Sequence, residues 1–307
     1  MTLNRRTFLK YQFHGMLWLS ATAGGWLRPG LALGADRPDI AVAKGGAAAA
    51  TRAAVELLGG MTRFVKKGSR VVIKPNMSFT STPERASNTD PLVVQTVAAM
   101  CREAGAGQVL VLDNPLGSAE RCLELSGIRA ACDTLDRDMV HMVSKGALFE
   151  ETAIPGAVTL SETSVMNAVL KADVLIAVPK AKSHSGAGVS LSMKGMMGLI
   201  KNRMVMHMMD LHEAIVDLAS LLRPHLVVID GTRVLSTGGP GGPGKVLKKD
   251  TVIASADMVA ADAYAVSAFE WYGKRYRPDQ VKHIRRAHER RLGRMDVDNL
   301  TIRSVSV

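Results

Sequence analysis

Cysteine is scarce in this sequence: Cys101, Cys122 and Cys132 are the only copies among 307 residues. No C-x-x-C pair occurs, which excludes the usual cysteine spacings of zinc and iron–sulfur sites, so we expect no iron–sulfur cluster. We expect the three thiols to be buried as small apolar groups. Aromatic residues are also few, at 4% of the chain. This scarcity disfavours a module that stacks on nucleic-acid bases, and we expect no nucleic-acid partner.

Acidic residues are outnumbered by basic ones, 28 against 39, which gives a formal net charge of +11. An excess of this sign indicates anionic ligands, an anionic lipid surface or simply a charge that keeps the protein soluble. Hydrophobic residues make up 47% of the chain, enough to bury a sizeable core.

The N-terminus has the three parts of an export signal. Arg5 and Arg6 are adjacent, a mildly apolar uncharged stretch follows at 13–27, and Ala32-Leu33-Gly34 forms a small-x-small cleavage pattern. This order predicts a twin-arginine signal peptide over 1–34 and an α/β domain over 35–307. We therefore expect a periplasmic protein that meets the twin-arginine translocon during export. Membrane contact would be transient, or would persist through an uncleaved signal.

Short runs rich in Val and Ile alternate with helical patterns along the rest of the chain. Expected strands cover 39–44, 70–74, 108–112, 139–143, 157–160, 173–178, 225–229, 251–254 and 300–305. Expected helices cover 46–58, 90–103, 118–127, 204–222, 257–272 and 278–292. The alternation predicts an α/β fold, with an open, mostly parallel or mixed sheet and helices on both faces.

Polar residues gather where the expected strands end. The ends carry Lys74 and Asn76, Asp113 and Asn114, the run Lys180 to His184, and Asp230. Ligands of α/β sheets bind outside the carboxyl ends of the strands, so these side chains are predicted to share a site. Lysine suits phosphate or carboxylate as a compact point charge.

A Gly-Pro stretch at 237–245 (TGGPGGPGK) has two interpretations. It is either a flexible loop or a backbone nest in which Gly239 and Gly241 approach an anion closely. The spacing is not G-x-G-x-x-G, so a dinucleotide fingerprint is unsupported.

Several motifs, taken in order, resemble the DUF362 family, a group without an assigned function. The resembling segments are 65–76 (VKKGSRVVIKPN), 89–94 (TDPLVV), 178–184 (VPKAKSH), 189–198 (VSLSMKGMMG), 223–231 (RPHLVVIDG), 238–240 (GGP) and 257–263 (DMVAADA). The resemblance implies that the residues shared with the family pattern are Lys74, Asn76, Lys180, His184, Lys194, Asp230 and Asp262.

The first functional hypothesis is a binding protein or enzyme for an anionic small molecule. Asn76, Lys180, Lys182, Gly239 and Gly241 would bind the ligand. His184 would carry a proton, with Lys74 and Lys194 as the other catalytic candidates. In a variant of this hypothesis, a divalent metal is held by Asp230, Asp262 and His184.

Two alternatives remain open. The first is a periplasmic metal-handling protein. One short region is rich in methionine and also carries His207 and His212; its methionines are Met193, Met196, Met197, Met204, Met206, Met208 and Met209. Thioether and imidazole together suit Cu(I), although methionine at helical spacing is also ordinary core packing.

The second alternative is a protein that binds a surface or a partner. The segment 274–294 carries nine Lys and Arg against Asp279 and Glu289, and predicts either a solvated helix face or a surface for lipid or an acidic partner.

Overall fold

Side chains of the central strands alternate between two buried faces, which accounts for the layered architecture. The computed structural model describes residues 37–307. In strand β7 (Val174–Val178), Val174 and Ile176 pack in one hydrophobic cluster and Leu175 packs in the other. Because both faces of such a strand are apolar, helices cover the sheet on both sides.

The main sheet has the strand order β12-β1-β11-β10-β7-β2-β3-β4, with β8 beside β10 and β9 beside β8. The bounds are β1 Ile40–Lys44, β2 Arg70–Pro75, β3 Gln108–Asp113, β4 Val140–Met142, β8 Lys180–His184, β9 Gly188–Ser190, β10 Leu226–Leu235, β11 Val246–Ser255 and β12 Ile302–Ser306. β2 is parallel to β3 and β7, and β10 is parallel to β7 and β8, whereas β11 is antiparallel to both of its neighbours. The predicted mostly parallel, mixed α/β sheet is confirmed. Strands β5 (Phe149–Ala153) and β6 (Glu162–Met166) form a separate antiparallel pair.

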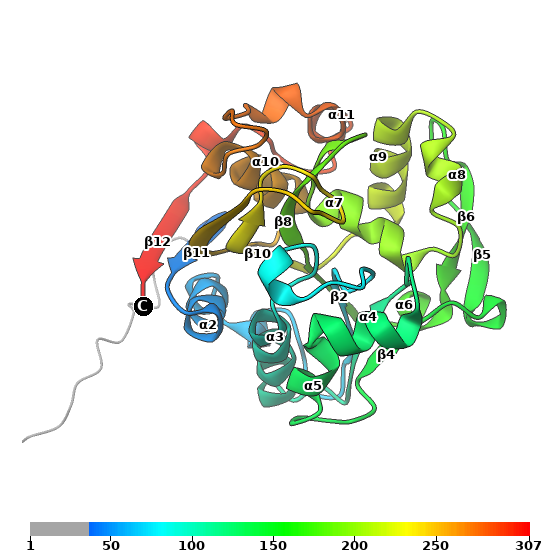
Figure 1. Ribbon diagram of the computed structural model, residues 1–307, viewed down its shortest axis with the longest axis vertical. Helices are drawn as coiled ribbons and strands as arrows, with labels where there is room; N and C mark the ends of the chain where they lie inside the picture. Colours follow the sequence, from blue (N-terminus) through cyan, green and yellow to red (C-terminus); the bar gives the residue numbers. More distant parts are fainter. Residues whose placement is uncertain (1–36) are drawn as a thin grey trace, which may run out of the picture. The chain divides into compact units, whose positions relative to one another are not determined.

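Helices lie on both sides of the main sheet (Figure 1). One side carries α2 Ala47–Leu57, α3 Pro91–Glu103, α4 Ala119–Ser126 and α5 Ile128–Cys132. The other side carries α7 Ser192–Gly195, α9 Leu211–Leu221, α10 Met258–Ala268 and α11 Lys282–Glu289. Two short helices, α6 (Asn167–Leu170) and α8 (Met204–His207), complete the set of α-helices in the described range. Short 3-10 turns lie at Met61–Arg63, Pro83–Arg85, Gly146–Leu148, Met196–Leu199, Pro278–Gln280 and Val297–Asn299.

Three predicted helix starts are confirmed by their caps. The carboxylate of Asp90 accepts from Leu92 N, the hydroxyl of Ser118 accepts from Arg121 N, and the carboxylate of Asp257 accepts from Val259 N. Each side chain supplies an acceptor for an N–H group that the first helical turn leaves without a partner.

The predicted helix over 204–222 is wrong as one element. Helix α8 ends at His207, and Asp210 begins α9 as its N-cap, accepting hydrogen bonds from His212 N and Glu213 N. The helical spacing runs through both pieces, but the capping carboxylate satisfies the first N–H groups of α9, which makes a separate start favourable.

The predicted strand at 157–160 is also wrong. Its backbone N–H groups at Val158, Thr159 and Leu160 donate to the carboxylate of Asp217 on α9 instead of to a strand. Pro155 and Gly156 place a turn just before it, so the apolar residues there do not extend a sheet. The strands β5, β6, β8 and β9 were not predicted from the sequence.

The three cysteines are buried, as predicted, and the structure shows them as free thiols. Burial raises the pKa of Cys101 to about 12 and that of Cys132 to about 12, so these thiols stay protonated. No helix within residues 37–307 is long and apolar enough to cross a membrane. The predicted signal peptide at 1–34 lies outside the described residues.

Candidate functional site

A cavity opens where β2, β3 and β8 end and where α7 and α8 approach the sheet. Its volume is about 110 Å³. Its polar lining consists of Lys74, Asn76, Ser78, Asp113, Lys182, His184, Ser190, Lys194, Arg203 and His207. Apolar lining comes from Phe79, Leu116, Met197, Met204 and Pro240. The structure therefore brings five of the predicted site residues together: Lys74, Asn76, Lys182, His184 and Lys194.

Asp113 is the carboxylate of this cavity, and its oxygens already have partners. Oδ1 lies 3.3 Å from Lys74 Nζ, and Oδ2 accepts from Met77 N at 2.9 Å and Ser78 Oγ at 2.8 Å. Asn114 N donates to Oδ1 as well. Burial lowers the pKa of Lys74, while Asp113 acts in the opposite direction. The pair is a neutral unit built into the cavity floor.

Three further cations lack a carboxylate within ion-pair distance among residues 37–307: Lys182, Lys194 and Arg203. Lys182 donates to the carbonyl of Ser87, and its Nζ lies 4.4 Å from the centre of the Phe79 ring. Arg203 donates to the carbonyl of Asn114. The cavity thus holds four cationic side chains and one carboxylate.

Burial lowers the pKa of each of these three cations. The pKa of Lys182 falls well below its ordinary value, with Lys74 as the next cause, and that of Lys194 falls to about 7, with Arg203 as the next cause. The pKa of Arg203 is lowered by burial as well. Desolvation is the largest cause for each of the three side chains, and neighbouring cations add to it for Lys182 and Lys194.

His184 is a neutral hydrogen-bond donor in this arrangement. Its Nδ1 accepts from Gly186 N and from Ala187 N, both at 3.1 Å, so the ring proton is on Nε2. Burial, followed by the charge on Lys194, lowers the pKa of His184 to about 3. The His207 ring stacks on it at 5.9 Å. With Nδ1 occupied and Nε2 protonated, the ring has no free lone pair for a metal.

Gly198 fits against the Lys74–Asp113 pair because it has no side chain. A Cβ there would lie 2.2 Å from Asp113 Oδ1 and 2.3 Å from Lys74 Cε. Gly239 is similarly close to β8: its Cβ would lie 1.9 Å from the carbonyl oxygen of Ser183, and its N donates to Ser183 Oγ. Gly241 packs on the Phe79 ring. The Gly-Pro stretch therefore closes over the cavity, and Pro240 is the member that lines it.

Asn76 joins the cavity to a second buried ion pair. Its Oδ1 accepts from Lys180 N at 2.8 Å. Lys180 Nζ lies 2.8 Å from Asp230 Oδ2, and Asp230 also accepts from Asp90 N and from Thr232. This pair lies outside the cavity lining, so the structure does not bring Lys180 and Asp230 to the site itself.

Asp262 has a different task from the metal ligation proposed for it. It accepts from Ser192 N at 2.8 Å, from Ser192 Oγ at 2.7 Å and from Met193 N at 3.0 Å, which holds the start of α7 against α10. Across residues 37–307, no three His, Cys, Asp or Glu side chains come together as a metal site. His184, Asp230 and Asp262 are accordingly in three separate hydrogen-bond networks.

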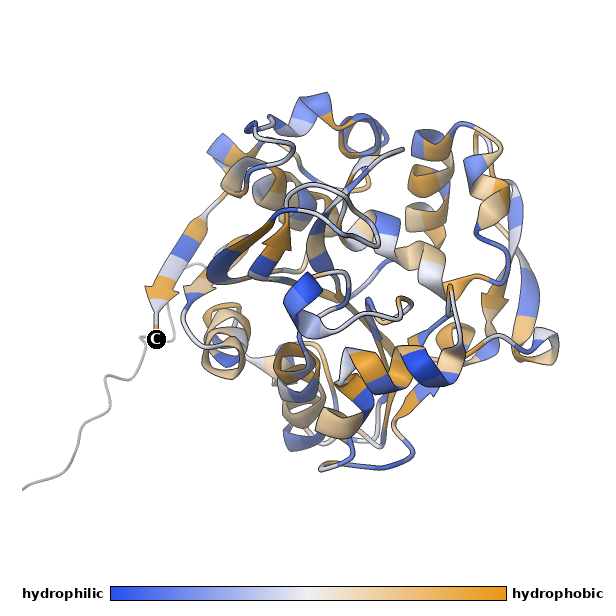
Figure 2. Cartoon of the chain, viewed as in Figure 1, coloured by the Kyte–Doolittle hydropathy of each residue, from blue (hydrophilic) through white to orange (hydrophobic). Residues whose placement is uncertain are grey.

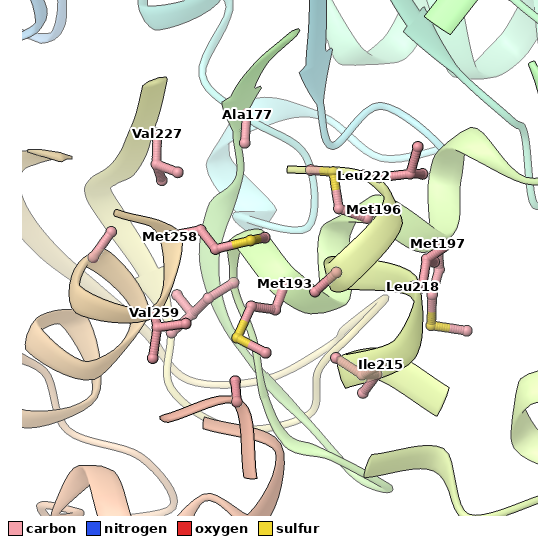
Figure 3. Packing of buried hydrophobic residues seen from close by; sticks show 14 of the residues in the cluster. Ala177, Met193, Met196, Met197, Ile215, Leu218, Leu222, Val227, Met258 and Val259 are labelled. Atoms are coloured by element: carbon pink, nitrogen blue, oxygen red, sulfur yellow. The ribbon is translucent and has the colours of Figure 1, made fainter. Parts of the chain in front are cut away.

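The methionines of the crowded region divide between core and surface. Met193, Met196, Met197 and Met206 are buried, and Figure 3 shows the first three among aliphatic side chains such as Ile215 and Leu218. Met204 and Met208 are exposed. Of the two histidines, His207 stacks on His184, while His212 stacks on His283 at 5.5 Å. The thioethers and imidazoles therefore do not face one common point.

The basic segment 274–294 is extensively paired with acids. Arg290 contacts Glu213 and Asp217 on α9, at 2.9 and 2.6 Å, and Arg286 lies 2.8 Å from Asp210. Figure 2 shows this hydrophilic segment around α11 largely in blue. These contacts attach α11 to α9 and neutralise part of the charge that suggested a lipid surface.

Arg203 was not among the predicted site residues, and His207 was named only as a possible copper ligand. The sequence feature that could have indicated this side of the cavity is Gly198. It ends a motif that resembles the family pattern, and such a glycine often marks a close backbone approach. Lys182 and His184 were placed in a loop after the strand at 173–178. Their spacing of two also suits one face of a strand, and β8 is that strand.

Comparisons with known proteins agree with the family resemblance of the motifs. Residues 71–267 match the family described as a domain of unknown function, DUF362. A thylakoid-associated protein of Synechocystis sp. is 32% identical over 225 residues, which cover 70% of this chain and 67% of that one. The apoprotein of lactate racemase from Thermoanaerobacterium thermosaccharolyticum aligns with TM-score 0.46 and 14% identity over 75% of this chain and 58% of that one. A structural-genomics protein from Thermotoga maritima aligns with TM-score 0.34 and 12% identity over 61% of this chain and 51% of that one.

The chain spans less than two thirds of either solved structure. The family match, in contrast, extends from the first residues of β2 to the end of α10 and includes every polar side chain of the cavity. On this evidence the chain belongs to the DUF362 family.

Proposed function

We propose that the cavity binds a small anion that carries phosphate or carboxylate groups. The observation that carries this proposal is the charge balance: Lys74, Lys182, Lys194 and Arg203 surround a single carboxylate, that of Asp113. A buried cation without a partner is costly, and a bound anion would offset that cost for three side chains at once.

The neutral groups of the cavity also suit an anion. The Nε2–H of His184 is a donor, and Asn76 has its Oδ1 occupied by Lys180 N, which leaves its amide N–H groups for a ligand. Donors that converge from several elements on one space are the usual arrangement for oxyanion recognition. A divalent cation suits this cavity poorly, because the oxygens of Asp113 already accept from protein donors.

Calorimetric titration tests the proposal. Sulfate represents a tetrahedral dianion and malonate a dicarboxylate, so the two titrations distinguish the phosphate type from the carboxylate type. We expect Arg203→Gln to weaken binding of the preferred anion by about 10-fold or more, the effect of losing one charge-assisted hydrogen bond.

Lys201→Gln is the matched control, since Lys201 is two residues away, exposed and outside the cavity lining. It removes the same charge and is expected to leave affinity nearly unchanged. Equal losses in both variants, or no saturable binding of either anion to the wild type, would refute the site.

We also propose that residues 1–34 direct export by the twin-arginine route. Arg5 and Arg6 with the mild apolar stretch support this, and the thylakoid association of the Synechocystis relative is compatible with a protein that works at a membrane system. Cell fractionation of an Arg5→Lys, Arg6→Lys double variant is the test. Export that proceeds as in the wild type would count against the proposal.

A further inference from the structure

Among the buried lysines in and beside the cavity, Lys194 alone has no partner within residues 37–307. Lys74 has Asp113, Lys180 has Asp230, and Lys182 donates to a carbonyl. Within the described range, neither a hydrogen-bond acceptor nor a carboxylate reaches Lys194 Nζ, although the residue is only 8% exposed and lines the cavity. An amine without a partner is free to bind a ligand or to react with one.

The backbone that carries Lys194 is firmly placed. Asp262 holds the first residues of α7 through three hydrogen bonds, and Met193 and Met196 on either side are in the core (Figure 3). Lys194 N–H and C=O are therefore on a short helix that is fixed on both sides. A side chain whose backbone is held in place and whose amine is free and partly desolvated is well placed to act as a reacting group.

The electrostatic surroundings favour the neutral amine. The charged and titratable groups that share the cavity with Lys194 are Lys74, Asp113, Lys182, His184, Arg203 and His207. Burial and the nearby guanidinium of Arg203 bring the pKa of Lys194 to about 7. A substantial fraction of Lys194 is then nucleophilic near neutral pH, whereas an ordinary lysine is almost entirely protonated there.

We propose that Lys194 is a nucleophile that forms an imine with an aldehyde or ketone carbon of an anionic ligand, whose acidic group is held by the other cations of the cavity. This inference rests on the anion site proposed above and assigns its ligand class: small carbonyl-bearing acids. The amine nitrogen attacks the carbonyl carbon, and the C=O electron pair moves to oxygen. Proton transfers from nitrogen to oxygen then release water and leave a C=N bond.

Reductive trapping tests the proposal. The full chain is incubated with glyoxylate and cyanoborohydride, which reduces an imine to a stable secondary amine, and the labelled position is found by peptide mass spectrometry. We expect one adduct, on Lys194, with a labelling rate that rises with pH through about 7 and that falls when sulfate competes.

Two variants make the result specific. Lys194→Arg keeps the positive charge but removes the primary amine, so it is expected to bind sulfate and to lose the adduct. Lys171→Arg changes an exposed lysine just before β7, at the opposite end of that strand, and is expected to keep both properties.

The outcomes separate this inference from the anion site. Saturable sulfate binding with no preferential label on Lys194, or a label that persists at the same rate in Lys194→Arg, would overturn the imine proposal and leave the anion site standing. Absence of both sulfate binding and labelling would overturn both.

Discussion

Lys180 and Lys194 are both buried, but their ammonium groups have different surroundings. Lys180 ends in a closed network in which Asp230 accepts from its ammonium, from Asp90 N and from Thr232. Lys194 ends in an open cavity without an acceptor in residues 37–307. The two lysines lie in neighbouring segments that resemble the family pattern, yet within residues 37–307 only Lys180 has a carboxylate partner. Burial of a lysine alone therefore does not distinguish the two cases, whereas the absence of a partner in the described residues does.

The closed network is expected to serve the fold and the open one the ligand. Asp230 connects β10 to β8 and to the start of α3, three elements that converge beside the cavity. The cavity, in contrast, is lined by three basic side chains that have no carboxylate partner within residues 37–307: Lys182, Lys194 and Arg203. Three measurements can break or sharpen this contrast.

The largest effect is expected for Asp230→Asn. The substitution leaves the ammonium of Lys180 buried without its carboxylate, and breaking a buried pair in this way costs about 3–5 kcal/mol of unfolding free energy. Urea denaturation measures the loss. Glu103→Gln, which removes a surface pair with Arg52, is the control and is expected to cost only a small fraction of that. If the two variants were equally stable, the closed network would not be structural.

A smaller loss of stability, together with loss of binding, is expected for Gly198→Ala. The new methyl group would overlap Asp113 Oδ1 and Lys74 Cε, so the pair must move, at a cost of about 1–3 kcal/mol. Sulfate titration of the folded variant is expected to show weaker binding. Gly46→Ala is the matched control, because nothing lies within 4 Å of a Cβ at Gly46. Unchanged sulfate affinity in Gly198→Ala would separate the pair from the site.

The smallest effect is a pH dependence of binding. The free site has a Lys194 pKa of about 7, and a bound anion favours the protonated amine. Sulfate affinity is therefore full below pH 7 and falls as the pH rises above it, by up to about 10-fold per pH unit until the bound-state pKa is reached. Sulfate keeps its charge across the neutral range, so the change reports on the protein. Lys194→Arg should remove the slope between pH 7 and 8; a slope that survives the substitution would assign the titration to another group.

The fold could be predicted from the sequence because its strands carry a strong signal. The runs 70–74, 108–112 and 173–178 are apolar on both faces and end at proline or an acidic residue, and the structure has strands at each. The predicted helix starts at 90, 118 and 257 agree with the caps Asp90, Ser118 and Asp257 in the structure. The errors at 157–160 and 204–222 share one cause, because in each case a side-chain carboxylate accepts hydrogen bonds from the backbone. Asp217 accepts from Val158 N and Thr159 N, and Asp210 accepts from His212 N at the start of α9.

The site could be predicted only in part. Strand ends brought Lys74, Asn76 and Asp113 together, as parallel strands must. Lys180 and Asp230 are separated from the cavity because they pair with each other, although they are 50 residues apart in the chain. Local sequence spacing cannot predict a contact at that separation. Arg203 lies directly before α8, outside the motifs that marked Lys74, Lys182 and Lys194, so no sequence pattern singled it out.

The three buried, unlinked thiols have a consequence for how the protein matures. Because the fold over 37–307 contains no disulfide, its formation requires no oxidant and is indifferent to the redox state of the surroundings. The same tertiary structure is accessible in a reducing cytosol and in an oxidising lumen. A chain of this kind can finish folding where it is synthesised and be moved afterwards without a chemical change to its interior.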